Sequence, residues 1–216
     1  MTEIDSPNSI LEFGSTHMHL AVYDKIFLNQ CSFYKEKINY TKIEESSKEQ
    51  PIFNLITKAE NDLNKHLNEV TLLIDSPSIH SLDFSIQKIF DKKIISKIEI
   101  DYLINDCEKI IKINNTDKEI IHTIKHRILI DDKETEYQNE IMREAHKVII
   151  DLKFILIEKN VCENFKKLFL QKHITIKNIF CTSYIKSLEI INKNQISGYS
   201  SFIDIGLNKS SLSIFK

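Results

Sequence analysis

Two short turns in this chain carry residue types that could hold a phosphate. In each turn an apolar run is followed by an acid, one apolar residue, a glycine and then mostly small or polar residues. The acid and the glycine are Glu12 and Gly14 in the first turn, and Asp204 and Gly206 in the second. Glycine permits positive φ and a close ligand approach, successive N–H groups can face an anion, and the acid can hold a metal ion through water. The chain has only 3 glycines in 216 residues, and these two lie about 190 residues apart. The pair therefore predicts duplicated halves that clamp a nucleotide.

The overall composition excludes several classes of protein. Lysine and arginine number 29 against 31 aspartate and glutamate residues, and the two signs are interspersed. This balance argues against a nucleic-acid coat and against a polybasic membrane patch. Hydrophobic residues make up 42% of the chain, enough for a packed core, and the length fits one large domain or two small ones. No apolar run reaches the roughly 18 residues that a membrane span needs.

Three other sets of residues have a functional and a plainer interpretation. His17 and His19 share one strand face and could bind a metal, but without a third ligand nearby in sequence we favour solvated histidines. A separate hypothesis places His17 near a phosphate. The acidic stretch 131–136 could bind calcium, but it lacks the glycine and the bidentate glutamate of a calcium loop, so we favour a solvated loop. The cysteines lack CxxC spacing and favour reduced, partly buried thiols over a disulfide or zinc framework: Cys31, Cys107, Cys162 and Cys181.

Hydrophobic periodicity predicts strands, a helix and a strand in the first part of the chain. Pro51 suits the first turn of that helix, and apolar residues then follow at helical spacing. The expected elements are a hairpin of strands 11–13 and 18–23 around Gly14, strands 26–34 and 38–43, a helix from 51 with an apolar stripe to 67, and a strand 70–75.

The middle of the chain predicts a small inserted subdomain. Ser96 and Glu99 form a possible capping box before a helical stripe over 100–111. Alternating apolar residues over 148–156 are the strongest strand signal in the chain. With strands at 84–90 and 120–130 and a polar loop at 131–143, the order is β-α-β-β.

After the insert, the chain returns to the pattern of strands and helices seen before it. Asn160 could cap a helix that extends to Phe169, a strand follows at 174–180, and a short helix at 184–191 ends before Ser197-Gly198 and the second turn. Without the insert, the order is a hairpin, a third strand, then helix and strand twice, a helix and a new hairpin. We therefore expect an α/β fold: an actin-like (ribonuclease-H-like) lobe with an inserted β-α-β-β subdomain, followed by the first hairpin of a second lobe.

On these features the chain resembles the bacterial cell-division family FtsA. The opening turn, Leu-Glu-Phe-Gly-Ser-Thr-His-Met at 11–18, is similar to that family's acid-x-Gly-small-small-Lys hairpin. The insert follows the fourth strand, where the family carries its extra subdomain. The segment from Ile174 to the Asp204 turn is similar to the end of the family's first lobe and the start of its second. The resemblance covers nearly the whole chain at low identity.

The resemblance implies a nucleotide site. Glu12 and Asp204 would face a magnesium ion, and ATP would bind between two lobes. The phosphates would be held by the opening turn on one side and by the second turn on the other: Gly14, Ser15, Thr16 and His17, then Gly206, Leu207 and Asn208. We expect at most a weak ATPase.

The resemblance also implies a cellular role. FtsA-like proteins self-associate into filaments, tether the FtsZ ring to the cytoplasmic side of the inner membrane at the division site, and recruit later division proteins. No nucleic-acid partner is implied, and membrane attachment would come from a C-terminal helix that this sequence lacks. Two alternatives stay open: the actin-like scaffold of type IV pilus assembly, and an actin-fold small-molecule kinase.

The expected domain organisation has four segments. Residues 1–77 and 158–198 form the two parts of lobe one, 78–157 form the insert, which would carry protein contacts, and 199–216 begin lobe two. We expect the chain to be the N-terminal part of a longer protein. A lone hairpin would expose its apolar side chains: Phe202, Leu212, Ile214 and Phe215.

Overall fold

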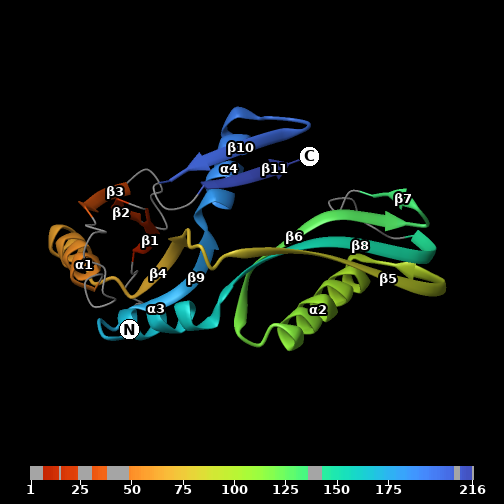
Figure 1. Ribbon diagram of the computed structural model, residues 1–216, viewed down its shortest axis with the longest axis horizontal. Coiled ribbons are helices and arrows are strands. Elements are labelled where there is room, and N and C mark those ends of the chain that lie inside the picture. Colours follow the sequence, from red (N-terminus) through yellow and green to blue (C-terminus); the bar gives the residue numbers. More distant parts are fainter. Residues whose placement is uncertain are drawn as a thin grey trace, which may run out of the picture. The chain divides into compact units, whose positions relative to one another are not determined.

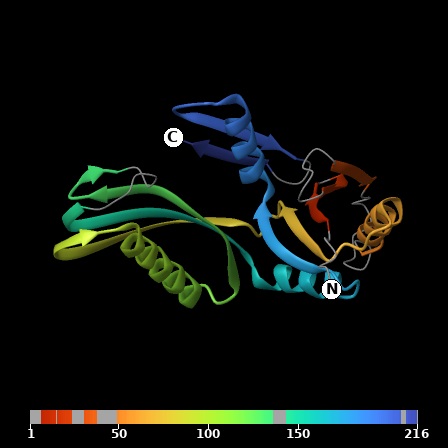
Figure 2. The same cartoon turned by 180° about the vertical axis from the view of Figure 1, so that it is seen from behind.

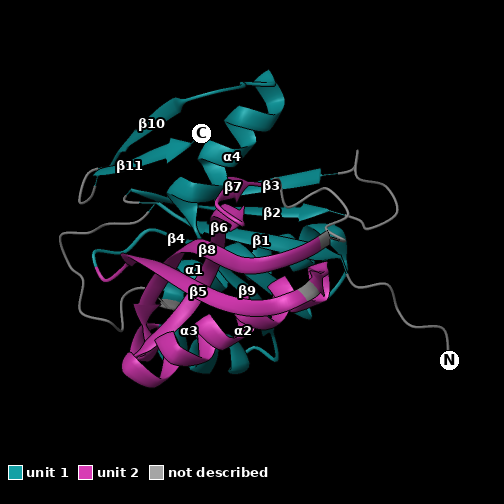
Figure 3. Cartoon of the chain, turned by 90° about the vertical axis from the view of Figure 1, so that its right-hand side faces the viewer, with its two compact units in different colours: residues 1–77, 162–216 teal, residues 78–161 magenta. Residues whose placement is uncertain are grey.

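The computed structural model describes residues 7–14, 16–23, 31–37, 49–135, 143–206 and 210–215. The chain divides into two compact units, which Figure 3 shows in different colours. Unit 1 comprises residues 1–77 and 162–216, and unit 2 comprises residues 78–161. Each unit is described by itself.

Unit 1 is built on a five-stranded sheet with the order β3-β2-β1-β4-β9 (Figures 1 and 2). Its strands are β1 (Asn8–Phe13), β2 (His17–Tyr23), β3 (Cys31–Lys37), β4 (Glu69–Ile74) and β9 (Thr175–Cys181). β1, β2 and β3 pair antiparallel, whereas β1, β4 and β9 run parallel. The predicted hairpin around Gly14 is confirmed. The predicted strand 26–34 is observed as β3 from Cys31 onward, and the strand predicted at 38–43 lies outside the described residues.

One face of this sheet carries the core of unit 1. Leu11, Leu20 and Leu72 come from three adjacent strands, and each is at most 1% exposed. Helix α1 (Glu49–Leu63) contacts β2 and β3 from this side, and the ring of Phe165 in α3 (Lys159–Leu170) lies 4.9 Å from the ring of Phe13. The apolar faces of two helices thus cover one side of the sheet.

Two helix boundaries differ from the sequence prediction. The apolar stripe continues to Leu67, but α1 ends at Leu63 because Asn64 adopts a left-handed φ of 49°. Leu67 is nevertheless buried, and its N–H donates to Glu60 Oε1 at 2.9 Å. Asn160, predicted as a helix cap, lies inside α3, which begins at Lys159.

The C-terminal part of unit 1 is a helix followed by a hairpin. α4 (Thr182–Asn194) follows β9 directly, and β10 (Ser200–Ile205) pairs antiparallel with β11 (Ser210–Phe215). The expected exposure of Leu212 and Ile214 is confirmed, at 59% and 70%. The same expectation for Phe202 and Phe215 is wrong. These two rings pack edge to face at 5.9 Å, and Phe215 also stacks on Tyr184 of α4 at 6.0 Å.

Unit 2 is a four-stranded antiparallel sheet with the order β5-β8-β6-β7. Its elements are β5 (His80–Ile95), α2 (Lys97–Asn114), β6 (Lys118–Ile130), β7 (Lys133–Glu134) and β8 (Arg143–Glu158). The predicted loop 131–143 is partly wrong, because it contains β7 and the first residue of β8. Asp131 and Asp132 adopt left-handed φ values of 49° and 63°, which turn the chain back so that β7 pairs with β6.

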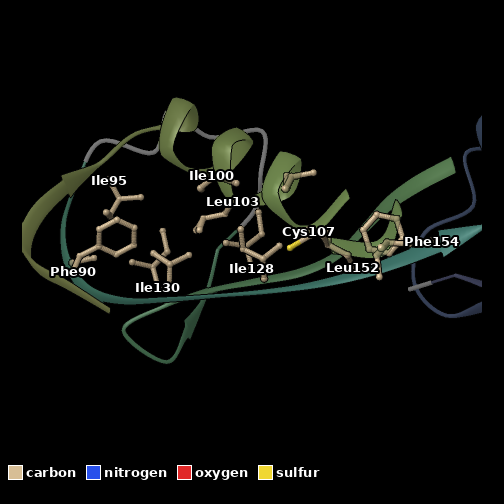
Figure 4. Packing of buried hydrophobic residues seen from close by; sticks show 14 of the residues in the cluster. Phe90, Ile95, Ile100, Leu103, Cys107, Ile128, Ile130, Leu152 and Phe154 are labelled. Carbon is tan, nitrogen blue, oxygen red and sulfur yellow. The ribbon is translucent and has the colours of Figure 1, made fainter. Parts of the chain in front are cut away.

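Helix α2 packs on one face of this sheet and forms the core of unit 2. Figure 4 shows Ile100, Leu103 and Cys107 of α2 lying against Ile128 and Ile130 of β6, all five at most 3% exposed. Burial raises the pKa of the Cys107 thiol to about 11. The apolar stripe predicted from the sequence is therefore the buried face of the helix.

The predicted capping box at the start of α2 is confirmed. Ser96 Oγ accepts the N–H of Ile98 at 3.2 Å, and Glu99 Oε2 accepts the N–H of Ser96 at 3.1 Å. These bonds satisfy backbone donors that the first helical turn leaves without intrahelical partners.

The opposite face of the sheet is polar at its centre. Asp151 accepts from Ser85 Oγ at 2.6 Å and from Arg127 Nε at 2.8 Å, across three adjacent strands. The hydrogen bond from Ser85, with the hydrogen bond and charge of Arg127, lowers the pKa of Asp151. This row of bonds pins the register of β5, β8 and β6 on the solvent side.

We expect His122 to make the stability of unit 2 depend on pH. Burial lowers the pKa of His122 to about 4, while a histidine in the unfolded chain titrates near pH 6.5. The unfolded state therefore takes up a proton first as pH falls. Stability present above pH 6.5 is lost toward pH 4, by up to about 3 kcal/mol.

Urea denaturation at pH 7 and pH 4.5 measures this loss. In His122→Gln the free energy of unfolding should fall less between the two pH values than in the wild type. An identical fall in both proteins would contradict the assignment.

Candidate functional site

Three parallel strands of unit 1 bring polar side chains to one edge of the sheet. Glu12 is the penultimate residue of β1, Asp75 follows the last residue of β4, and Cys181 ends β9 just before α4. Because β1, β4 and β9 run parallel, their carboxyl ends lie at the same edge. In open α/β sheets, ligands bind outside the carboxyl ends of the strands.

Glu12 forms an ion pair with Lys186 of α4 at this edge. Its Oε1 lies 2.6 Å from Lys186 Nζ, and its Oε2 lies 3.5 Å from His19 Nδ1 on β2. The side chain of Glu12 is 20% exposed and that of Lys186 is 47% exposed. Both carboxylate oxygens of Glu12 therefore have a nitrogen partner within the protein.

Asp75 is held by the start of α4. Ser183 Oγ donates to Asp75 Oδ1 at 3.4 Å, and Cys181 Sγ lies 3.8 Å from the same oxygen. The Cys181 thiol and the Ser183 hydroxyl are 3.2 Å apart, and both residues are buried. These contacts fix the Asp75 carboxylate beside the junction of β9 and α4.

The Lys186 ammonium links the acids of this edge electrostatically. Burial lowers the pKa of Lys186, but the hydrogen bond and charge of Glu12, together with the charges of Asp204 and Asp75, raise the pKa above its ordinary value. Glu12 lies on β1, Asp75 follows the last residue of β4, and Asp204 lies on β10. Of the two acids that the sequence singled out, Glu12 contacts this lysine directly, and the charge of Asp204 acts on its pKa.

Sequence reasoning missed Asp75 and Lys186 as site residues. An acid directly after an apolar strand and before Ser76-Pro77 was a usable signal for Asp75. No comparable signal marks Lys186, because one lysine in an amphipathic helix is an ordinary surface residue.

The opening turn is closed by its own backbone. The N–H of Gly14 donates to the carbonyl oxygen of His17 at 3.0 Å, and a Cβ at position 14 would lie 2.7 Å from that oxygen. Glycine is required here by this close approach and not by positive φ, which only Gly198 among the described glycines adopts. Ser15 lies outside the described residues. The Gly14 N–H itself points into the hairpin.

His17 lies on a basic strip formed by β2 and β3. Its Nδ1 is 3.0 Å from Thr16 Oγ1, and its ring stacks with that of His19 at a centroid distance of 6.3 Å. Desolvation, followed by the charges of Lys35, His19 and Lys37, lowers the pKa of His17. The register places His17 opposite Lys37 and His19 opposite Lys35. Such a strip favours an anionic ligand over a metal ion.

The second turn is described only at its ends. Gly206 follows β10, and Asp204 pairs with Ser211 in the hairpin register. The expected phosphate-binding residues Leu207 and Asn208 lie outside the described residues.

The residues of this edge do not fit a magnesium ion as they are arranged. Magnesium needs oxygen ligands at about 2.0–2.1 Å in near-octahedral geometry. Within the described ranges, no three His, Cys, Asp or Glu side chains lie close enough to hold a metal ion. Glu12 is paired with Lys186 and His19 instead.

We expect Gly14→Ala to destabilise unit 1 by about 1–3 kcal/mol, the usual cost of forcing extra atoms into a packed position. The added Cβ would meet the His17 backbone, which cannot move without opening the turn. Thermal unfolding compares this variant with Gly198→Ala, where a Cβ would meet no atom within 4 Å but the φ of 82° is strained. A Gly14→Ala protein as stable as the wild type would contradict the close approach.

Comparison with known proteins finds two weak sequence relatives and a similar fold. No family model matches it. Two curated relatives, both named cell division protein FtsA, come from Helicobacter pylori strains 26695 and J99; each is 24% identical over 101 residues. The match spans 47% of this chain but only 20%, about a fifth, of each relative.

A solved structure decides the fold. A chain of a PilM-PilN type IV pilus biogenesis complex superposes with a TM-score of 0.56 at 11% identity, covering 98% of this chain and 58% of that chain. The chain has an actin-like fold. A Bacteroides thetaiotaomicron protein of unknown function with an actin-like ATPase fold is also similar, at 11% identity and a TM-score of 0.47, covering 100% of this chain and 67% of that protein. The α/β fold class predicted from the sequence is confirmed.

Proposed function

We propose that this chain is part of an FtsA-like cell-division adaptor, which tethers an FtsZ ring to the inner membrane and recruits later division proteins. One observation carries the proposal: sequence similarity to FtsA occurs in a chain whose actin-like unit is interrupted after β4 by a separate compact unit. The proposed location is the cytoplasmic side of the membrane at the division site. No described helix is long and apolar enough to cross a membrane.

Unit 2, residues 78–161, is proposed as the protein-contact module of this adaptor. Ile98 and Tyr102 lie one turn apart on α2 and are 64% and 66% exposed, and Ile89 on β5 is 74% exposed. Single exposed apolar residues are ordinary, but neighbouring ones that share a helix face, as Ile98 and Tyr102 do, are typical of protein interaction surfaces. Self-association through unit 2 would suit a filament-forming protein.

The nucleotide proposed for this adaptor is ATP, at the edge where β1, β4 and β9 end. The actin-like fold and the basic strip of His17, Lys35 and Lys37 support this placement. Glu12, proposed from the resemblance as a magnesium ligand together with Asp204, is paired with Lys186 and His19 instead.

Co-sedimentation with FtsZ polymers tests the adaptor role. The amount of wild-type chain in the pellet should rise with the concentration of FtsZ polymers, above the amount that pellets without them. A chain that stays in solution at every FtsZ concentration would argue against the proposal.

Self-association is tested separately by sedimentation velocity. The double variant Ile98→Ala, Tyr102→Ala should self-associate more weakly than the wild type. Phe33→Ala in unit 1, at a residue 77% exposed, is the matched control and should behave as the wild type.

The second candidate is a scaffold of type IV pilus assembly, which the similarity to a PilM-PilN complex favours. Capture of PilN, without binding of FtsZ, would select this alternative. Transfer of a phosphoryl group from ATP to a small molecule would reject both scaffolds and favour an actin-fold kinase.

A further inference from the structure

We propose that β3 docks an acidic, extended segment of a partner protein as an additional antiparallel strand. The segment would place acidic side chains opposite Lys37 and Lys35 and an apolar side chain opposite Phe33. This inference goes beyond the proposed function, because it assigns a partner chemistry to one strand of unit 1. It holds whether or not ATP binds at the edge where β1, β4 and β9 end.

The first observation is the position of β3 at the end of its sheet. In the order β3-β2-β1-β4-β9, the strand is bonded to β2, and no other strand that the structure describes pairs with it. An edge strand presents unpaired backbone N–H and C=O groups, to which an extended peptide can add by β-augmentation. β3 is 7 residues long and pairs with β2 along its whole length without a register shift. Its outer edge is therefore a regular template for a further strand.

The side chains of β3 determine what such a strand would meet. Phe33, Lys35 and Lys37 alternate along β3 and so share one face. Phe33 is 77% exposed, and both lysines are exposed as well. Tyr34, which lies between them in sequence, is buried on the other face. An added strand would therefore meet these three side chains with every second residue.

Charge decides which segment fits this edge. The register with β2 places His17 opposite Lys37 and His19 opposite Lys35, so the exposed face is basic. Within the described ranges, no ion pair involves either lysine. Opposite charges directly across two strands stabilise the pairing, whereas like charges oppose it. The two lysines would thus reject a basic strand and select an acidic one.

Two other anionic partners fit the basic strip less well. A strip with 2 lysines falls short of the roughly 4–8 lysine or arginine residues that mark a membrane-binding cluster. Nucleic-acid binding likewise depends on neutralising several phosphates with lysine and arginine. An acidic peptide needs only one carboxylate for each lysine, and its backbone would gain hydrogen bonds from the edge of β3.

Fluorescence anisotropy with the full chain, at low salt and without nucleotide, tests the inference. The probe is a labelled synthetic peptide with the order Asp-Thr-Asp-Thr-Phe between flanking threonines. The wild type should bind it more tightly than the same peptide with asparagine in place of aspartate. It should also bind it more tightly than Asp-Asp-Thr-Thr-Phe, in which the acids no longer alternate. The double variant Lys35→Met, Lys37→Met should bind the probe at least about fivefold more weakly, because two opposite-charge cross-strand pairs are lost.

A charge exchange separates direct pairing from an indirect effect on the fold. The double variant Lys35→Glu, Lys37→Glu should lose the acidic probe and bind a peptide with lysine in place of aspartate. Lys177→Met is the matched control, because Lys177 lies on β9, the strand at the other end of the sheet, and its side chain is 52% exposed. This control should bind the acidic probe as the wild type does, and circular dichroism checks the folding of each variant.

Three results would each overturn the inference: a wild type that does not bind the acidic probe, equal affinity of the wild type and Lys35→Met, Lys37→Met, or no rescue by the exchange of charges. Attachment to phosphatidylserine vesicles through the two lysines, without peptide binding, would also overturn it and assign the basic strip to a membrane. ATP is absent from the assay and FtsZ binding is measured separately. The inference and the proposed function can therefore fail independently.

Discussion

Replacing Phe154 with alanine is expected to destabilise unit 2 by about 3–5 kcal/mol. Phe154 lies on β8, is 0% exposed, and packs edge to face against Phe84 at a centroid distance of 6.4 Å. Truncation removes a large apolar side chain from water-free surroundings and leaves a cavity that α2 and the sheet can close only in part.

Native-state hydrogen exchange, read by mass spectrometry, checks this expectation. Backbone amides of β5, β6 and β8 should lose protection by about two to three and a half orders of magnitude, because each 1.4 kcal/mol is a factor of ten. Ile89→Ala, at a residue 74% exposed on β5, is the control and should change protection little. Equal effects of the two substitutions would show that the core assigned to unit 2 is wrong.

Leu72→Ala is expected to destabilise unit 1 by about 2–5 kcal/mol. Leu72 is 0% exposed at the centre of β4, next to Leu11 of β1 and Ile179 of β9 in the sheet register. Because Asp75 follows the same strand, disorder of β4 should also loosen the carboxylate edge around Lys186.

Urea denaturation followed by far-ultraviolet circular dichroism measures the loss, and hydrogen exchange should locate it in residues 1–77 and 162–216. Phe33→Ala is the control on the same sheet, since Phe33 is 77% exposed. Unchanged protection of β1, β4 and β9 in Leu72→Ala would contradict the central position of Leu72 in the core.

The elements of both units could be read largely from local patterns. Alternation over 148–156 marked β8, helical spacing over 100–111 marked α2, and Ser96 with Glu99 marked its cap. These signals are local because side-chain period and capping depend on neighbours within a few residues. The prediction of a loop over 131–143 was partly wrong because β7 forms by pairing with β6, and such pairing leaves no local signal.

Some features of the candidate site could likewise be predicted from local sequence, and others depended on packing. The sequence by itself determined that Glu12 and Gly14 stand at the end of a strand and in a tight turn, and that Asp204 repeats the pattern in a second hairpin. It also determined the order of elements that makes an actin-like fold. These features depend on residue type and spacing along the chain.

Only the tertiary structure decided what the acids contact. Lys186 lies far from Glu12 in sequence, and its 2.6 Å ion pair exists because α4 follows β9 directly and passes beside the end of β1. In the same way, Phe215 is covered because Tyr184 of α4 stacks on its ring. Contacts between segments so distant in sequence leave no local periodicity, so the partner of each acid was settled by packing and not by sequence pattern.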